Sequence, residues 1–68
     1  MRLSARNQIK GKILEVTIGA TTSHVRVEIA SGQIITSSIT NQAVDELGLK
    51  AGMTATVVIK ASDVMIAV

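Results

Sequence analysis

Two short segments of this sequence each place a cationic side chain beside a hydroxyl: Ser4-Ala5-Arg6-Asn7 and Lys60-Ala61-Ser62. A tetrahedral oxyanion that is fully deprotonated at neutral pH accepts hydrogen bonds and donates none, so a pocket that suits it presents only donors. Arginine, lysine and serine side chains are such donors, and the small residues Ala5 and Ala61 let backbone N–H groups approach a ligand closely. The two segments therefore predict a site for an oxyanion.

Thr40 offers a third set of donors, because it directly precedes a segment that we expect to be a short helix. The first N–H groups of a helix have no partner within it, so they and the threonine hydroxyl favour an anion. From the residues alone a simpler interpretation also stands: Arg6 and Lys60 are solvated charges, Ser4 and Ser62 are turn residues, and Thr40 is an ordinary helix cap.

Catalytic and metal-binding arrangements are not evident in the sequence. His24 is the single histidine, and no carboxylate beside it in sequence would orient it as a general base. Cysteine is absent, and the five Asp and Glu residues show no clustered ligand spacing. We therefore expect neither an enzyme nor a metal centre, and no cofactor.

Nucleic-acid binding is disfavoured by composition. Folds that hold single strands do so with aromatic side chains on which bases stack and with a basic groove. This sequence has no Phe, Tyr or Trp, and its formal net charge is only +2, without a basic run. We expect no nucleic-acid partner.

The length of 68 residues allows one hydrophobic core, so we expect a single domain over residues 1–68. Small domains usually need disulfides, a metal or association with other subunits. Hydrophobic residues make up 47% of the chain and the mean hydropathy is +0.45, which favours a homo-oligomer with aliphatic contacts. No segment is long and apolar enough for a signal peptide or a membrane span, so we expect a cytoplasmic protein with no membrane partner.

The pattern of apolar residues predicts the elements that must position these side chains. The apolar positions of the first strand change parity near Ile13 and Leu14, which indicates a bulge. A short helix is expected to begin after Thr40 or Asn41 and to end at Gly48, a residue that tolerates the left-handed conformation. The predicted strands cover residues 9–18, 24–29, 34–39, 53–60 and 64–68. Five strands with a helix between the third and fourth predict an all-β, OB-like Greek-key barrel.

The chain resembles the molbindins, or Mop domains, over nearly its whole length. The resemblance rests on three motifs taken together: Ser4 through Gly11, then Ile39-Thr40-Asn41 followed by Glu46-Leu47-Gly48-Leu49, and finally Ile59 through Val64. It implies an OB-like barrel that assembles by exchanging or pairing strands across subunits, as a homohexamer built as a trimer of dimers.

The resemblance also implies the ligand and its residues. The ligand would be molybdate or tungstate, bound at subunit interfaces by a protein of molybdenum storage or homeostasis. The implied oxyanion-binding residues are Ser4, Ala5, Arg6, Thr40, Lys60, Ala61 and Ser62. Ala43 departs from relatives that have a serine at this position, so either a backbone group or water replaces that hydroxyl donor or the site is weaker. The alternative function is an oligomerising structural module that binds no ligand.

Overall fold

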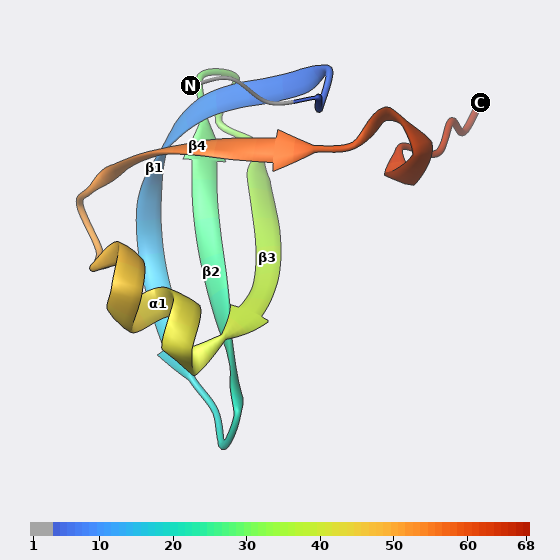
Figure 1. Cartoon of the computed structure of the whole chain (residues 1–68). Helices are drawn as coiled ribbons and strands as arrows, with labels where there is room; N and C mark the ends of the chain where they lie inside the picture. Colours follow the sequence, from blue (N-terminus) through green and yellow to red (C-terminus); the bar gives the residue numbers. More distant parts are fainter. Residues whose placement is uncertain (1–3) are drawn as a thin grey trace.

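The first strand organises the whole sheet, because its two halves pair with different partners. The structure is a computed structural model that describes residues 4–68. Its elements are β1 (Asn7–Ile18), β2 (Thr22–Ile29), β3 (Ile34–Thr40), α1 (Asn41–Leu47), β4 (Thr54–Ile59) and the 3-10 turn η1 (Ala61–Asp63). The strands form one antiparallel sheet in the order β3-β2-β1-β4, which curls into a half-barrel (Figure 1).

A bulge divides β1 as the sequence predicts. Ile13 lies opposite Val27 in β2, but the next pair is Glu15 with Arg26, so Leu14 is the extra residue. The first half of β1 also pairs with β4, from Asn7 opposite Ile59 to Lys12 opposite Thr54. A bulge increases local twist and bends the strand, which lets β1 serve both neighbours.

The core lies on the concave face of the sheet. Ile13, Val25, Val27 and Val44 are buried, and Ile13 is only 1% exposed. In β1 and β2 the inward-facing side chains alternate with exposed ones, as expected for a half-buried sheet, and Val44 reaches the core from α1. The partly buried residues packed against this core are Val16, Ile39, Leu49, Ala55 and Val57.

Gly11 is required where β1 crosses closely over β2. A Cβ atom at this position would lie 2.6 Å from Val27 Cγ1 and 2.7 Å from the carbonyl oxygen of Glu28. Only glycine fits at this separation, since the second contact is with backbone that cannot rotate away.

The helix begins and ends as predicted. Thr40 has extended backbone angles and its hydroxyl accepts a hydrogen bond from the N–H of Ala43, while Gly48 adopts the left-handed conformation with φ of 63°. The chain then returns to β1, where Ile13 donates to the carbonyl of Met53 and accepts from Gly52, both at 2.8 Å. These bonds hold the helix and the start of β4 over the core.

The predicted fifth strand is wrong for this single chain. Residues 64–68 are apolar and β-branched enough to suggest a strand, but they follow η1 and extend away from the sheet (Figure 1). A strand needs the free edge of another strand, and no strand described in residues 4–68 pairs with this segment. We call residues 64–68 the C-terminal arm; Met65 and Ile66 are 92% and 85% exposed.

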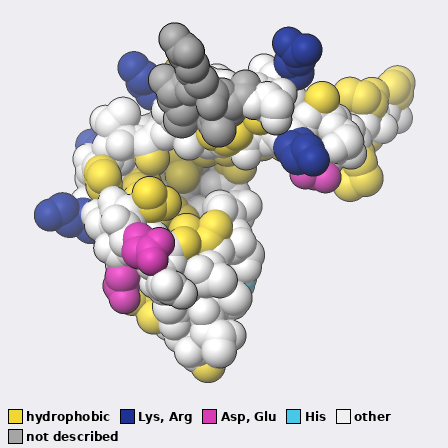
Figure 2. All heavy atoms as spheres, in the orientation of Figure 1, with side chains coloured by type: hydrophobic (Ala, Val, Ile, Leu, Met, Phe, Trp, Pro, Cys, Tyr) yellow, Lys and Arg dark blue, Asp and Glu magenta, His cyan; other side chains and the backbone are white. Residues whose placement is uncertain are grey.

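Because this strand is missing, the barrel is open on one side. An apolar groove lies on the concave face, between α1 and β4. Figure 2 shows hydrophobic side chains both in this hollow and along the C-terminal arm. The residues that line the groove are Ile13, Val25, Ser37, Ile39, Leu47, Leu49, Met53, Thr54, Ala55, Thr56 and Val57.

Candidate functional site

The structure brings two of the three predicted donor segments together. Asn7 and Ile59 form the last pair of the β1–β4 ladder, and the Asn7 side-chain amide donates to the carbonyl of Ile59 at 3.2 Å. Residues 4–6 and residues 60–62 therefore leave the sheet at the same end. We call these six residues the cationic end. Their side chains are exposed except for Ala5, which is partly buried.

The backbone that follows Lys60 leaves N–H donors near the charged side chain. Lys60 is extended, with φ of −63° and ψ of 140°, and η1 begins at Ala61. The N–H of Asp63 donates to the Lys60 carbonyl at 2.9 Å, and that of Val64 to the Ala61 carbonyl at 3.3 Å. The first N–H groups of such a turn have no partner inside it, so those of Ala61 and Ser62 are free to face a ligand.

The positive charge of the cationic end is not neutralised by ion pairs within residues 4–68. The ion pair found in this part of the chain joins Arg26 to Glu15, with 3.5 Å between Nη1 and Oε1. Within residues 4–68, no carboxylate therefore pairs with Arg6 or Lys60. Asp63, at the end of η1, is exposed and is the acidic residue closest to Lys60 in sequence.

Thr40 lies at the opposite end of the sheet from the cationic end. It ends β3 opposite Thr22, and β1 reaches this end only at Ile18, opposite Ser23. The path from Asn7 to Ile18 covers on the order of 30 Å along a strand. The donors of one small anion must all lie within about 3 Å of its oxygens. A single chain therefore cannot place Thr40 and Arg6 on the same anion.

The Thr40 hydroxyl nevertheless has a defined geometry. Its Oγ1 accepts the N–H of Ala43 at 3.1 Å, so the hydroxyl proton remains available to an outside acceptor. Ala43 contributes its backbone N–H to the cap and has no side-chain donor of its own. The neighbouring Asn41 donates its side-chain amide to the carbonyl of Gly19 at 3.0 Å and accepts a bond from the Ser23 hydroxyl.

Ser23 and Asn41 were not among the predicted site residues. One signal was present in the sequence, because Ser23 has the same strand parity as Val25 and Val27 and so belongs to the buried face. The partner of a buried hydroxyl is set by tertiary contact, and Asn41 is distant in sequence.

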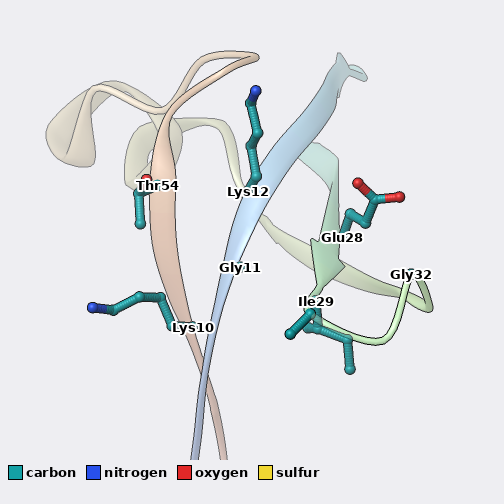
Figure 3. A pocket seen from close by; sticks show the side chains of 8 residues that line it. Lys10, Gly11, Lys12, Glu28, Ile29, Gly32 and Thr54 are labelled. Atoms are coloured by element: carbon teal, nitrogen blue, oxygen red, sulfur yellow. The ribbon is translucent and has the colours of Figure 1, made fainter.

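A second hollow lies on the outer face of the sheet, away from all the predicted site residues. Its lining is Lys10, Gly11, Lys12, Glu28, Ile29, Ala30, Gly32 and Thr54. Figure 3 shows the Lys10 and Lys12 side chains pointing in different directions, with Glu28 on the far side of β1. Because the two ammonium groups do not converge, this hollow does not form a pocket of donors for one anion.

His24 lies exposed on the outer face of β2. Within residues 4–68, no group of three or more His, Cys, Asp or Glu side chains is arranged to hold a metal ion. In the same part of the chain, no helix has the length and hydropathy needed to cross a membrane.

Comparisons with known proteins agree with this architecture. The model of the TOBE domain family matches residues 3–66. Molybdenum-pterin-binding proteins 1 and 2 of Clostridium pasteurianum are 52% and 50% identical over 66 residues, which is 97% of this chain and 97% of each relative.

Solved structures show the same fold. MopII from Clostridium pasteurianum superposes with a TM-score of 0.93 at 48% identity, covering 98% of this chain and 100% of MopII. The cytoplasmic molybdate-binding protein ModG, with molybdate bound, gives a TM-score of 0.91 at 46% identity, covering 96% of this chain and 46% of that one. Because TOBE and Mop proteins are binding proteins, the chain is not an enzyme. This chain therefore belongs to the TOBE domain family and, within it, to the single-domain Mop proteins, or molbindins.

Proposed function

We propose that this protein binds molybdate, or the similar tungstate, at interfaces between copies of itself in the cytoplasm, as part of molybdenum storage or homeostasis. The observation that carries the proposal is the separation of the donors. Within the described part of the chain, residues 4–68, Arg6 and Lys60 of the cationic end have no carboxylate partner, and Thr40 lies at the other end of the sheet. Two copies packed end to end complete one site.

In this arrangement each residue has a distinct role. Arg6 and Lys60 supply positive charge, Ser4 and Ser62 supply hydroxyl donors, and the backbone N–H groups at Ala61 and Ser62 complete one side. Thr40 of a second copy closes the other side with its free hydroxyl proton. All these groups donate, which suits an anion that carries no proton at neutral pH. Such a site disfavours phosphate, which keeps a proton that it would have to donate.

The open barrel supports the oligomer independently of the ligand. The arm at residues 64–68 is apolar and exposed, and the concave face exposes an apolar groove in the same chain. Pairing the arm of one copy with the sheet edge of another would hide both surfaces and supply the missing fifth strand. We propose that six copies assemble in this way, as a trimer of dimers.

The experiment is a calorimetric titration of the anion-free protein with molybdate, repeated with tungstate, sulfate and phosphate. We expect the two metalates to bind tightly and the smaller anions weakly, because a smaller anion cannot reach every donor. The melting temperature should rise with the metalates, since a ligand that binds only the folded state stabilises it.

Two variants separate this function from a structural module without ligand. Arg6→Ala removes a proposed donor, whereas Lys50→Ala removes an exposed cation outside the proposed site and serves as the control. Losing a charge-assisted hydrogen bond costs about 1.5–3 kcal/mol, or about 10- to 150-fold in affinity. If the wild type assembles but gives neither heat nor a melting shift with any of these anions, the protein is an oligomerisation module. If Arg6→Ala binds as tightly as Lys50→Ala, Arg6 lies outside the site.

A further inference from the structure

Asn41 makes three hydrogen bonds from the start of α1, two to the connection between β1 and β2 and one to Ser23 in β2. Its backbone N–H donates to the carbonyl of Thr21 at 3.0 Å. Its side-chain amide donates to the carbonyl of Gly19 at 3.0 Å, and its side-chain oxygen accepts from the Ser23 hydroxyl at 2.5 Å. The polar atoms of one side chain are thus shared between a turn and a buried strand residue.

Ser23 is an unusual residue for its position. It is 1% exposed and lies on the same face of β2 as Val25 and Val27, which belong to the core. A buried hydroxyl costs free energy unless it is hydrogen-bonded, and an apolar residue of similar size would satisfy this face equally well. The hydroxyl is therefore better explained by what it holds in place than by core stability alone.

Thr40 lies next to the hydrogen bonds of Asn41 and Ser23. Thr40 directly precedes Asn41, lies opposite Thr22 in the β2–β3 ladder, and its Oγ1 accepts the N–H of Ala43. Three sets of contacts therefore fix this hydroxyl: the strand pairing, the helix cap and the bonds of Asn41. Because Oγ1 acts as the acceptor in the cap, the hydroxyl proton is not used by that bond and can be donated to a ligand.

We infer that Ser23 and Asn41 are positioning residues for the Thr40 hydroxyl in the oxyanion site, an inference that rests on the proposed function. They do not touch the anion. They hold the segment that presents Thr40, so that the hydroxyl meets the anion without first having to be ordered. Losing either residue should reduce molybdate affinity through Thr40 while leaving Arg6 and Lys60 unaffected.

A double-mutant cycle tests this, because the two positions are coupled only if Asn41 acts through Thr40. We would measure molybdate affinity by calorimetry for the wild type, Thr40→Val, Asn41→Ala and the double variant, well below each melting temperature. Thr40→Val should weaken binding about tenfold or more, the effect of losing a charge-assisted hydrogen bond. Asn41→Ala should weaken binding several-fold alone and have no further effect in the Thr40→Val background.

Ser23→Ala provides a second route if Asn41→Ala fails to fold, and the same cycle with Thr40→Val applies to it. Ser37→Ala is its matched control, because Ser37 is also on the inner face but has no side-chain hydrogen bond to Asn41. A change in melting temperature with unchanged affinity would overturn the positioning role, and so would additive losses in the cycle. If Thr40→Val binds molybdate normally, both the proposed role of Thr40 and this inference are wrong.

Discussion

Mixing two variants that each damage a different half of the proposed site tests whether copies of the chain share it. Arg6→Ala removes a donor at the cationic end, and Thr40→Val removes the hydroxyl at the opposite end of the sheet. If one copy supplies Arg6 and another supplies Thr40, a mixed oligomer contains some sites that are wholly wild type and others that lack both groups. Sites built within one chain could never recover in this way.

The shared site sets the affinity that each variant should lose and the fraction of sites that mixing should restore. Each variant alone loses a hydrogen bond to a charged acceptor, which lowers affinity by about 10- to 150-fold. When the two variants are present in equal amounts and assemble at random, the probability that a site has an intact Arg6 is one half. The probability that it has an intact Thr40 is also one half. About one quarter of the sites should therefore regain wild-type affinity.

The assay requires that subunits exchange completely. The two variants are unfolded together, refolded as a mixture and titrated with molybdate, after native mass spectrometry with one isotope-labelled variant confirms mixed oligomers. We expect a tight-binding phase with about one quarter of the wild-type stoichiometry and a weak phase for the rest. If mixed oligomers form and no tight phase appears, the site is not shared as we describe.

A matched mixture of Arg6→Ala with Lys60→Ala serves as the control. The pairing of Asn7 with Ile59 places both residues at the same end of one chain, so mixing should restore nothing. Recovery in this mixture would show that Arg6 and Lys60 of one site come from different copies, which would contradict our reasoning about the cationic end.

Two further predictions concern the fold and the assembly. Gly11→Ala should lower the free energy of unfolding by about 1–3 kcal/mol in urea denaturation, because the new Cβ would lie 2.6 Å from Val27 Cγ1 and 2.7 Å from the Glu28 carbonyl oxygen. A stability equal to wild type would mean that the two strands are less closely spaced than described. Deleting residues 64–68 should prevent assembly, because it removes the exposed apolar arm, and light scattering would then report a smaller species. An unchanged oligomer would exclude the arm from the interface.

Local features of the fold followed directly from the sequence. The alternation of Val25 and Val27 with exposed neighbours predicted β2, and the change of parity near Leu14 predicted the bulge. The caps at Thr40 and Gly48 predicted both ends of α1. Each of these features depends on residues close together in the chain, so short-range steric and hydrogen-bonding preferences are enough to determine them.

The sequence also predicted the chemistry of a site. The two segments with a cation beside a hydroxyl indicated an oxyanion, and the Mop resemblance that they carry is confirmed by the comparisons. Side-chain type determines which groups donate and which are charged, and this does not depend on the fold. The residues assigned to the site remain a proposal.

Only the tertiary structure decided where these residues lie. The register of β1 with β4 brings residues 4–6 beside residues 60–62, and the length of β1 separates them from Thr40. The expected fifth strand fails because strand propensity does not supply an edge to pair with. The hydrogen-bond partner of Ser23 could not be predicted from the sequence either, since Asn41 reaches it only when β3 is paired with β2. Contacts between distant segments depend on how the whole chain packs, and local sequence patterns do not encode that packing.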